Sequence, residues 1–208
     1  MAESPRDLLT TAAFQAADKS RALALVAQAI TASDRILAAR PGDHEATLQR
    51  AIAIGYRGKL TRSRSDVRAS LTVFKQLATQ NPRDAEAQMV IAGWHLGAID
   101  QLGGFVAGAA LGARTQAGEV ALMRAVTLGG DRAFYPGLAA LMQIRKDTDD
   151  VPRARRWAEA AVAAQTPTPL DSIMKRAALA MLPALRANDG KAAALLARKL
   201  LPFGKLPD

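Results

Sequence analysis

The chain of 208 residues contains no cysteine, which excludes disulfide bonds, thiolate metal sites and cysteine nucleophiles. Aromatic residues make up only 4% of it, a scarcity that disfavours a β-sandwich or barrel, because strands are enriched in aromatic and β-branched residues. No stretch keeps the apolar–polar alternation of strands, and no run approaches the roughly 20 apolar residues that span a bilayer. Alanine, leucine and other helix formers dominate instead. We therefore predict an all-α protein with a core of small, closely packed residues.

Residues suited to catalysis are also scarce. The only two histidines, His44 and His95, lack a His-x3-His spacing or a neighbouring carboxylate cluster, although a metal site needs three or four converging ligands. The sequence has no Gly-x-Ser-x-Gly, no Walker-type phosphate loop and no paired carboxylates in an apolar context. We therefore predict no metal, no cofactor and no enzymatic activity, and we expect the protein to act by binding.

A set of helix-packing positions recurs along the chain, in which a small or aromatic residue is followed by residues at +4 and +7 and then by a Pro or Gly turn. The copies are Ala29, Ser33, Ile36 and Pro41; Ser70, Phe74, Leu77 and Pro82, 41 positions later; Gly118, Leu122, Ala125 and Gly130; and Ala154, Ala158 and Ala161 ahead of Pro167. A repeat of about 34–47 residues is typical of stacked helical hairpins. We predict a right-handed superhelical stack of antiparallel hairpins, a tetratricopeptide-repeat-like α-solenoid.

Capping residues, prolines and glycines divide this pattern into helices. The expected helices cover residues 5–17, 20–39, 44–57, 66–80, 84–102, 116–128, 132–147, 151–165, 170–187 and 190–201. We expect Tyr56–Ser65 to be a hairpin loop, residues 103–118 to be a glycine-rich insertion, and the tail to fray from about residue 202. Since no linker interrupts the chain, residues 1–208 are predicted to form a single domain.

The packing positions carry a family resemblance. Met89, Ala92, Gly93 and Leu96, with the copy that begins at Gly118, are similar to the tetratricopeptide-repeat pattern at its key positions. The block Ala85–Ser172 resembles the helical domain of the regulator-of-microtubule-dynamics family and its bacterial relatives. The resemblance is carried by Ala85–Ala87, Gly93–His95, the insertion ending near Leu111–Ala113, Ala121–Ala125, Arg155–Ala158 and Thr168–Asp171. It implies a superhelical binding domain with protein partners or phospholipid ligands, and no catalytic residues.

Residues 103–112 are apolar and free of charge, so exposing Phe105, Val106 and Leu111 together would leave an adhesive patch. Either the segment packs as a short extra helix between repeats, or it forms a flexible wall over an apolar groove. Such a groove would suit an acyl chain or an apolar peptide. Its candidate lining is Trp94, His95, Phe105 and Leu111. For His95 the alternatives are a hydrogen-bonded core histidine and a ligand contact.

The net charge is +9, from 28 Lys and Arg against 19 Asp and Glu. A basic run holds a single acid, Asp66, and is made of Arg57, Lys59, Arg62, Arg64 and Arg68. Arginine at this density binds phosphates or carboxylates well, but few aromatics are interleaved, which disfavours nucleic acid. The run is either a solvated hairpin tip or a partner-docking patch. A smaller basic cluster comprises Arg153, Arg155 and Arg156.

Two functions follow from these observations. The first is a non-catalytic scaffold that presents a concave helical surface to a protein or peptide. The second is a soluble carrier or sensor of a lipid or other apolar ligand. Residues 1–12 include Glu3, Arg6 and Asp7 and lack the apolar core of a secretory signal, while residues 2–5 are similar to the region after a small-residue cleavage site. We expect a periplasmic protein whose signal has been removed, or alternatively a cytoplasmic protein as written.

Overall fold

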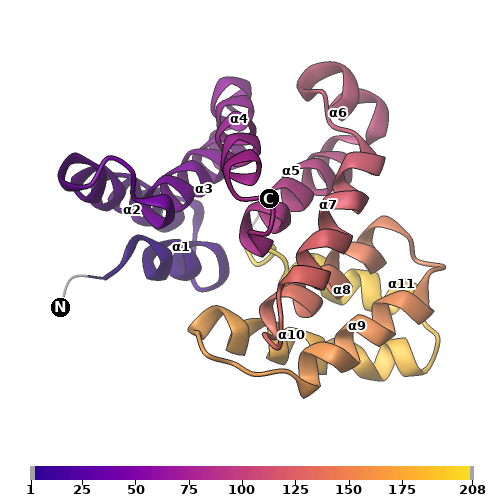
Figure 1. Ribbon diagram of the computed structural model, residues 1–208. Coiled ribbons are helices and arrows are strands. Elements are labelled where there is room, and N and C mark those ends of the chain that lie inside the picture. Colours follow the sequence, from indigo (N-terminus) through magenta and orange to yellow (C-terminus); the bar gives the residue numbers. More distant parts are fainter. Residues whose placement is uncertain (1–2, 207–208) are drawn as a thin grey trace.

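In a computed structural model of the protein, the structure describes residues 3–206. These residues form eleven α-helices and no strand, which confirms the all-α prediction (Figure 1). The helices are α1 (Pro5–Phe14), α2 (Lys19–Ala39), α3 (His44–Thr61), α4 (Arg64–Gln80), α5 (Ala85–Leu102), α6 (Gly104–Leu111), α7 (Thr115–Leu128), α8 (Phe134–Lys146), α9 (Val151–Ala163), α10 (Pro169–Arg186) and α11 (Gly190–Leu200).

Most helices begin at a side chain that caps the first turn by accepting a backbone N–H. Asp43 and Asp84 cap α3 and α5 in this way, and Thr168 forms a capping box with Asp171 at the start of α10. The loop expected over Tyr56–Ser65 is much shorter than predicted, because α3 continues to Thr61. Only residues 62 and 63 separate α3 from α4: the first ends α3 in a left-handed conformation and the second caps α4.

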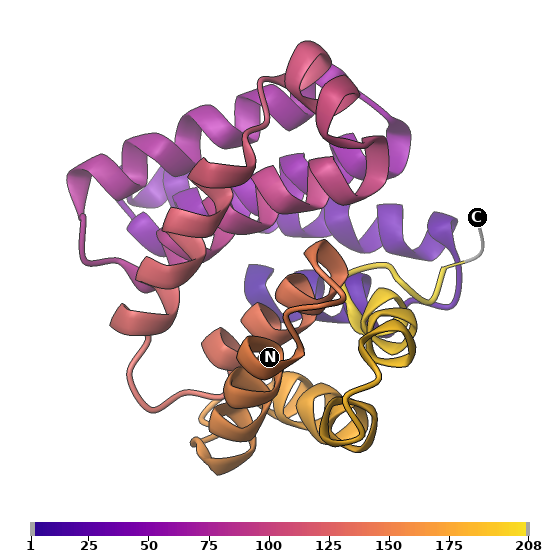
Figure 2. The same ribbon diagram turned by 90° about the vertical axis from the view of Figure 1, so that its right-hand side faces the viewer.

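Neighbouring helices pack against one another along the chain. Helix α1 packs on α2, α2 on α3, α3 on α4, α5 on α7, α8 on α9 and α9 on α10. The chain then turns back on itself, because α11 packs on α8 as well as on α10, and α1 contacts α10. Figure 2 shows the result: the orange and yellow C-terminal helices gather beneath the purple and magenta helices of the first half.

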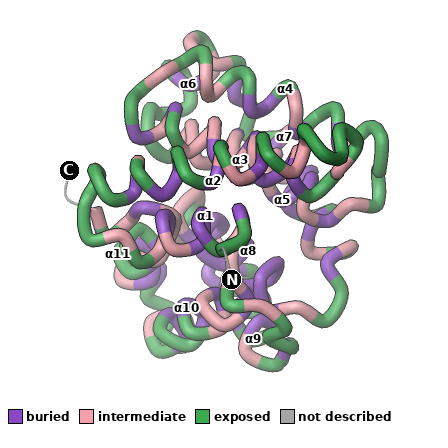
Figure 3. The backbone as a smooth tube through the Cα atoms, turned by 90° about the vertical axis from the view of Figure 1, so that its left-hand side faces the viewer, coloured by how far each residue is buried: buried purple, intermediate pink, exposed green. Residues whose placement is uncertain are grey.

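Small residues at the repeated packing positions are buried. Ala125, Ala158 and Ala161 are fully buried within the largest core cluster, which joins α5 and α7 to α8–α11. Gly118 is buried at the contact of α7 with α5, where an added Cβ would lie 2.8 Å from the side chain of Leu96. In Figure 3 the buried positions lie where helices face one another and the exposed positions lie on the outside.

We expected the tail to fray from about residue 202. In its described part, residues 202–206, the tail packs against the first half of the chain instead. The Phe203 side chain is buried and meets the Tyr56 ring edge-on, with the ring centroids 4.8 Å apart. The Phe203 N–H donates to the carbonyl of Ala13 at 2.7 Å, and Lys59 donates to the carbonyl of Pro202 at 3.1 Å. An aromatic side chain seated between α1 and α3 therefore anchors this end.

Candidate binding surface around α6

Helix α6 is a short apolar helix on the outside of the molecule. Glycines with positive φ, Gly103 and Gly112, flank it and let the chain turn sharply at both ends. Within the helix only Ala107 is buried, whereas the Phe105 side chain is 89% exposed. Figure 1 shows α6 at one end of the molecule, beyond the ends of α4, α5 and α7. The glycine-rich segment thus forms the short helix of our first alternative, but its aromatic residue does not pack into the repeats.

Two contacts hold α6 in place. The Arg68 guanidinium on α4 donates to the carbonyl of Ala110 at 2.5 Å, and a cation at the last turn of a helix is favoured by the helix dipole. The N–H of Ala113 donates to the carbonyl of Ala107 at 3.2 Å and closes the C-terminal end. These backbone contacts, together with the buried Ala107, hold the helix in place and leave Phe105 and Val106 exposed.

Trp94 and His95 lie beneath this helix and act as packing residues. The Trp94 indole donates to the carbonyl of Val67 at 2.6 Å and so joins α5 to α4. His95 is buried, and its Nδ1 accepts the backbone N–H of Arg114 at 3.1 Å, which positions the start of α7. Burial, together with the positive charges of Lys75 and Arg114, lowers the pKa of His95. The neutral imidazole therefore has the role of a hydrogen-bonded core histidine.

Of the four residues expected to line a groove, Trp94 and His95 meet edge-on, with ring centroids 4.9 Å apart. His95 is buried, Trp94 and Leu111 are partly buried, and Phe105 projects into solvent.

The basic run separates into three groups. Arg57 donates two hydrogen bonds to Asp66, at 2.7 and 3.0 Å, and this pairing raises the pKa of Arg57 and lowers that of Asp66. Lys59 lies over the Phe203 ring at 5.6 Å from its centroid, and its burial lowers its pKa. Arg62, Arg64 and Arg68 are exposed at or near the α3–α4 turn, and Arg68 reaches α6.

We define the α6 surface as three exposed apolar residues bordered by three arginines: Leu102, Phe105, Val106, Arg64, Arg68 and Arg114. Arg64 and Arg68 are one turn apart on α4, and Arg114 precedes α7, so the arginines come from both sides of α6. The acids of the adjoining helices are already paired: Asp66 binds Arg57, Asp100 binds Arg145 and Glu119 binds Lys146. The surface therefore combines an apolar centre with a cationic border.

A second cluster of charges joins the first turns of α1, α3 and α5. Arg6 donates to Glu45 and Glu86 over distances of 2.7–3.0 Å. Burial alone would lower the pKa of Arg6, but the hydrogen bonds to the two carboxylates outweigh it and raise that pKa. Burial and the charge of Glu86 raise the pKa of Tyr135 to about 12.

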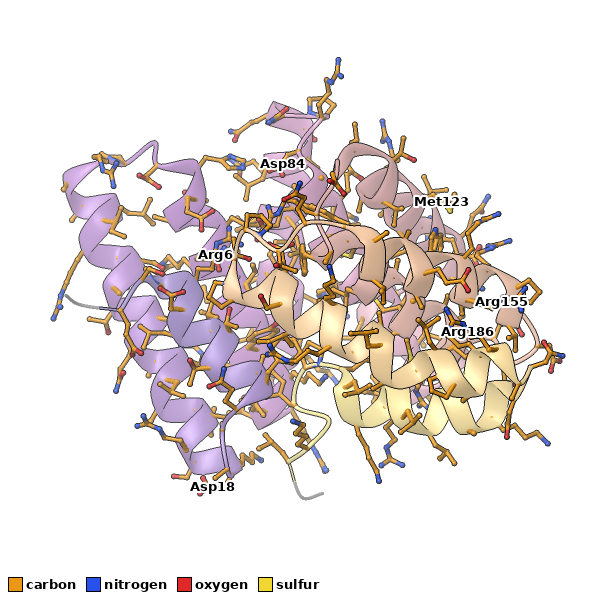
Figure 4. The ribbon with its side chains drawn as sticks, turned by 90° about the horizontal axis from the view of Figure 1, so that it is seen from below. Arg6, Asp18, Asp84, Met123, Arg155 and Arg186 are labelled. Atoms are coloured by element: carbon orange, nitrogen blue, oxygen red, sulfur yellow. The ribbon has the colours of Figure 1, made fainter. Side chains whose placement is uncertain are left out.

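His44 pairs with Asp84 at 2.7 Å beside this cluster. Figure 4, which views the molecule from below, labels Arg6 and Asp84 of these contacts. It also labels Arg155 and Arg186 on the C-terminal helices. These contacts of Arg6 and His44 join α1, α3 and α5, so the cluster fastens these helices together. Within residues 3–206 no three His, Asp or Glu side chains come together in a way that could hold a metal ion.

Comparison with protein families, with curated proteins and with solved structures finds no match to this chain. One helix in the described residues, α2, is long and apolar enough to cross a membrane by length and composition alone. A core helix and a signal sequence meet the same criterion. In this structure one side of α2 packs on α1 and α3 through Ala22, Leu25 and Ala29.

Proposed function

We propose that this protein is a non-catalytic binding protein that docks a protein or peptide partner through the α6 surface. The observation that carries the proposal is the 89% exposure of Phe105 in a helix without charge. Aromatic and arginine side chains supply most of the binding energy at protein interfaces. Burying one phenylalanine contributes about 1.5–3 kcal/mol. The matching partner offers an apolar pocket for Phe105 and acidic groups for Arg64 and Arg114.

The scaffold in this proposal is a tetratricopeptide-like stack of five hairpins. Its members would be α1 with α2, α3 with α4, α5 with α7, α8 with α9, and α10 with α11. The packing of α2 on α3, α4 on α5, α7 on α8 and α9 on α10 supports this stacking. So does the resemblance to the regulator-of-microtubule-dynamics family. In such a stack α6 is an insertion between the two helices of the third hairpin.

The α6 surface is a better candidate than the concave face of the stack. The first helices of the hairpins would line that face, and Arg6 there is already bound to both Glu45 and Glu86. A partner would have to break these ion pairs before it could use them. The arginines Arg64 and Arg114, in contrast, make no side-chain hydrogen bond or ion pair with any residue between 3 and 206.

A photo-crosslinking experiment tests the proposal. Benzoylphenylalanine replaces Phe105 in one variant and Leu195 in a control, since Leu195 is 64% exposed on the distant helix α11. We expect one discrete crosslinked partner from position 105 and none from position 195. The partner, once identified and purified, should bind the Phe105→Asp variant about 10- to 100-fold more weakly than wild type, and the Leu195→Asp control unchanged. Equal crosslinking at both positions, or unchanged binding of Phe105→Asp, would contradict the proposal.

The lipid-binding alternative predicts a different result in a companion assay. An apolar helix bordered by arginines also matches an anionic bilayer. Sedimentation with vesicles of phosphatidylserine and phosphatidylcholine, against vesicles of phosphatidylcholine alone, measures this directly. If the wild type sediments with the anionic vesicles, Phe105→Asp does not, and no protein crosslinks to position 105, then the partner is a membrane and not a protein.

A further inference from the structure

A small cavity lies where the C-terminal end of α1 meets α10, the end of α11 and the tail, away from the α6 surface. Its volume is about 180 Å³. It is bounded by the end of α1, one side of α10, the end of α11 and the tail. The lining residues are Ala13, Phe14, Ile173, Arg176, Ala177, Lys199, Leu200, Leu201 and Lys205. Residues from distant parts of the sequence thus form one site that exists only when the chain has closed on itself.

The floor of the cavity is apolar and its cations lie at the surface. Phe14, Ile173 and Leu200 are partly buried and supply the aliphatic and aromatic wall. Arg176 and Lys199 are exposed, as is Lys205 in the tail, and no acidic residue lines the cavity. An apolar floor beneath a cationic mouth suits a ligand that is apolar at one end and anionic at the other.

The three cations of this mouth are free to bind a ligand. Among residues 3–206 none of them makes an ion pair or a side-chain hydrogen bond. Several arginines elsewhere have carboxylate partners, as Arg50 does in Asp34 and Arg132 in Asp171, whereas these three cations have none in the described part of the chain. Like charges that converge on one cavity repel each other unless an anion lies between them. The arrangement therefore gains free energy from a bound anion, which no residue among 3–206 supplies at this cavity.

We propose that this cavity binds a small anionic amphiphile, with a carboxylate or phosphate held by Arg176, Lys199 and Lys205 and an apolar body resting on Phe14, Ile173 and Leu200. An apolar cavity of about 150 Å³ accommodates one benzene molecule, so a cavity of 180 Å³ accepts an apolar body of about six carbon atoms. The site is separate from α6 and does not depend on the proposed function.

Binding at this cavity also links the end of α1 to α10 and the tail. The ligand contacts α1, α10 and the tail at once, and none of these contacts survives unfolding. A ligand that binds only the folded state stabilises it by RT ln(1 + [L]/Kd), so the melting temperature keeps rising with ligand concentration. The probe that fits the cavity should therefore raise the melting temperature of the wild type with increasing concentration.

Hexanoate and hexyl phosphate are the probes. 1-Hexanol is the control that keeps the alkyl chain without the negative charge, and acetate is the control that keeps the charge without the long alkyl chain. Isothermal titration and backbone amide shifts measure binding to the whole protein. We expect saturable binding of one or both anions, with shifts at Ala13 and Ala177, and weaker binding of hexanol and acetate. Preference for hexanoate or for hexyl phosphate identifies the headgroup, and either preference supports the site.

Variants show whether the cavity itself is responsible. Lys199→Ala and Arg176→Ala should each weaken binding about tenfold, the equivalent of 1.4 kcal/mol, and increasingly so at low salt. Lys191→Ala is the matched control, because Lys191 is exposed on the same helix as Lys199 but does not line this cavity. Ile173→Ala removes three carbon atoms from the apolar floor and should also weaken binding, while Phe105→Asp should leave binding unchanged.

Three results would overturn the proposal. They are the absence of saturable binding of either anion by the wild type, equal losses in Lys191→Ala and Lys199→Ala, and hexanol binding as tightly as the preferred anion. The melting curve of each variant without ligand shows that it is folded. Because Phe105→Asp leaves this cavity intact, a failure here and a failure of the α6 surface remain distinguishable.

Discussion

Replacing Ala158 by leucine tests whether the repeated small residues set the distance between helices. Ala158 lies in the middle of α9, is fully buried, and belongs to the core cluster that α9 shares with α8 and α10. Leucine adds three carbon atoms where no space is left. Overpacking of this kind costs about 1–3 kcal/mol, a large share of the roughly 5–15 kcal/mol that stabilises a domain. For a chain of this size, about 2 kcal/mol lowers the melting temperature by about 4–8 °C.

The matched control is Ala160→Leu, two residues further along the same helix, where the side chain is exposed. Helix propensity differs little between alanine and leucine, so this variant should stay within about 0.5 kcal/mol of wild type. Urea unfolding followed by circular dichroism at 222 nm measures both variants. If Ala158→Leu unfolds at the wild-type midpoint, or if both variants lose the same stability, the packing role of these alanines is refuted.

Three further predictions concern other parts of the molecule. Asp171→Ala should cost about 1–3 kcal/mol, because the buried carboxylate accepts hydrogen bonds from Phe134, Thr168 and Arg132, and urea unfolding checks this value. Burial alone would raise the pKa of Asp171, but the hydrogen bonds to its carboxylate lower that pKa. The stability that Asp171 contributes should therefore be complete above about pH 4 and disappear as the pH falls through the folded-state pKa. The difference in unfolding free energy between wild type and Asp171→Ala should shrink over that range. Phe203→Ala should cost up to about 3–5 kcal/mol, and amide exchange at residue 203 should accelerate because the tail detaches. Arg64→Ala should change the unfolding free energy by less than about 0.5 kcal/mol, while binding of the α6 partner weakens in a salt-dependent way.

Helix boundaries were predictable because their signals are local. Asp43 and Asp84 stand 41 residues apart, each just after a proline-containing turn, and each caps the helix that follows it. A capping side chain acts on the backbone within three residues, so the sequence alone contains the whole interaction. The glycines around residues 103–112 gave the same kind of information, and the structure places positive φ values at Gly103 and Gly112.

Contacts between distant residues were not predictable in this way. The tail was expected to fray, since nothing near Phe203 in the sequence holds it. Phe203 contacts the Tyr56 ring and the Ala13 carbonyl, and Lys59 donates to the carbonyl of Pro202, which is 143 residues away along the chain. The extra turn of α3 has the same origin, because Tyr56 and Lys59 lie on a helical stretch that packs against that tail.

The basic run shows the same limit for a binding site. Five basic residues close in sequence resembled one patch, but a helix turns by 100° per residue, so neighbours in sequence face different sides. Arg57 meets an acid on the next helix and Lys59 meets the tail, whereas Arg68 reaches α6. Arg114 was missed because it lies outside the run. The cavity residues were missed because they come from three separate segments.

The charge balance connects the two proposed sites. The acids of α3–α5 and α7 form ion pairs within the molecule, including Asp66 with Arg57, Glu86 with Arg6 and Glu119 with Lys146. The net charge of +9 means that cations outnumber acids, and several of these cations have no acidic partner among residues 3–206. Some of those cations border exposed or cavity-lining apolar groups, around α6 and at the mouth of the cavity. A cation beside an apolar surface favours a partner that is both apolar and anionic, and salt weakens only the attraction between the opposite charges. Binding at either site should therefore decline with ionic strength but persist at high salt, whereas binding through charge alone would be abolished.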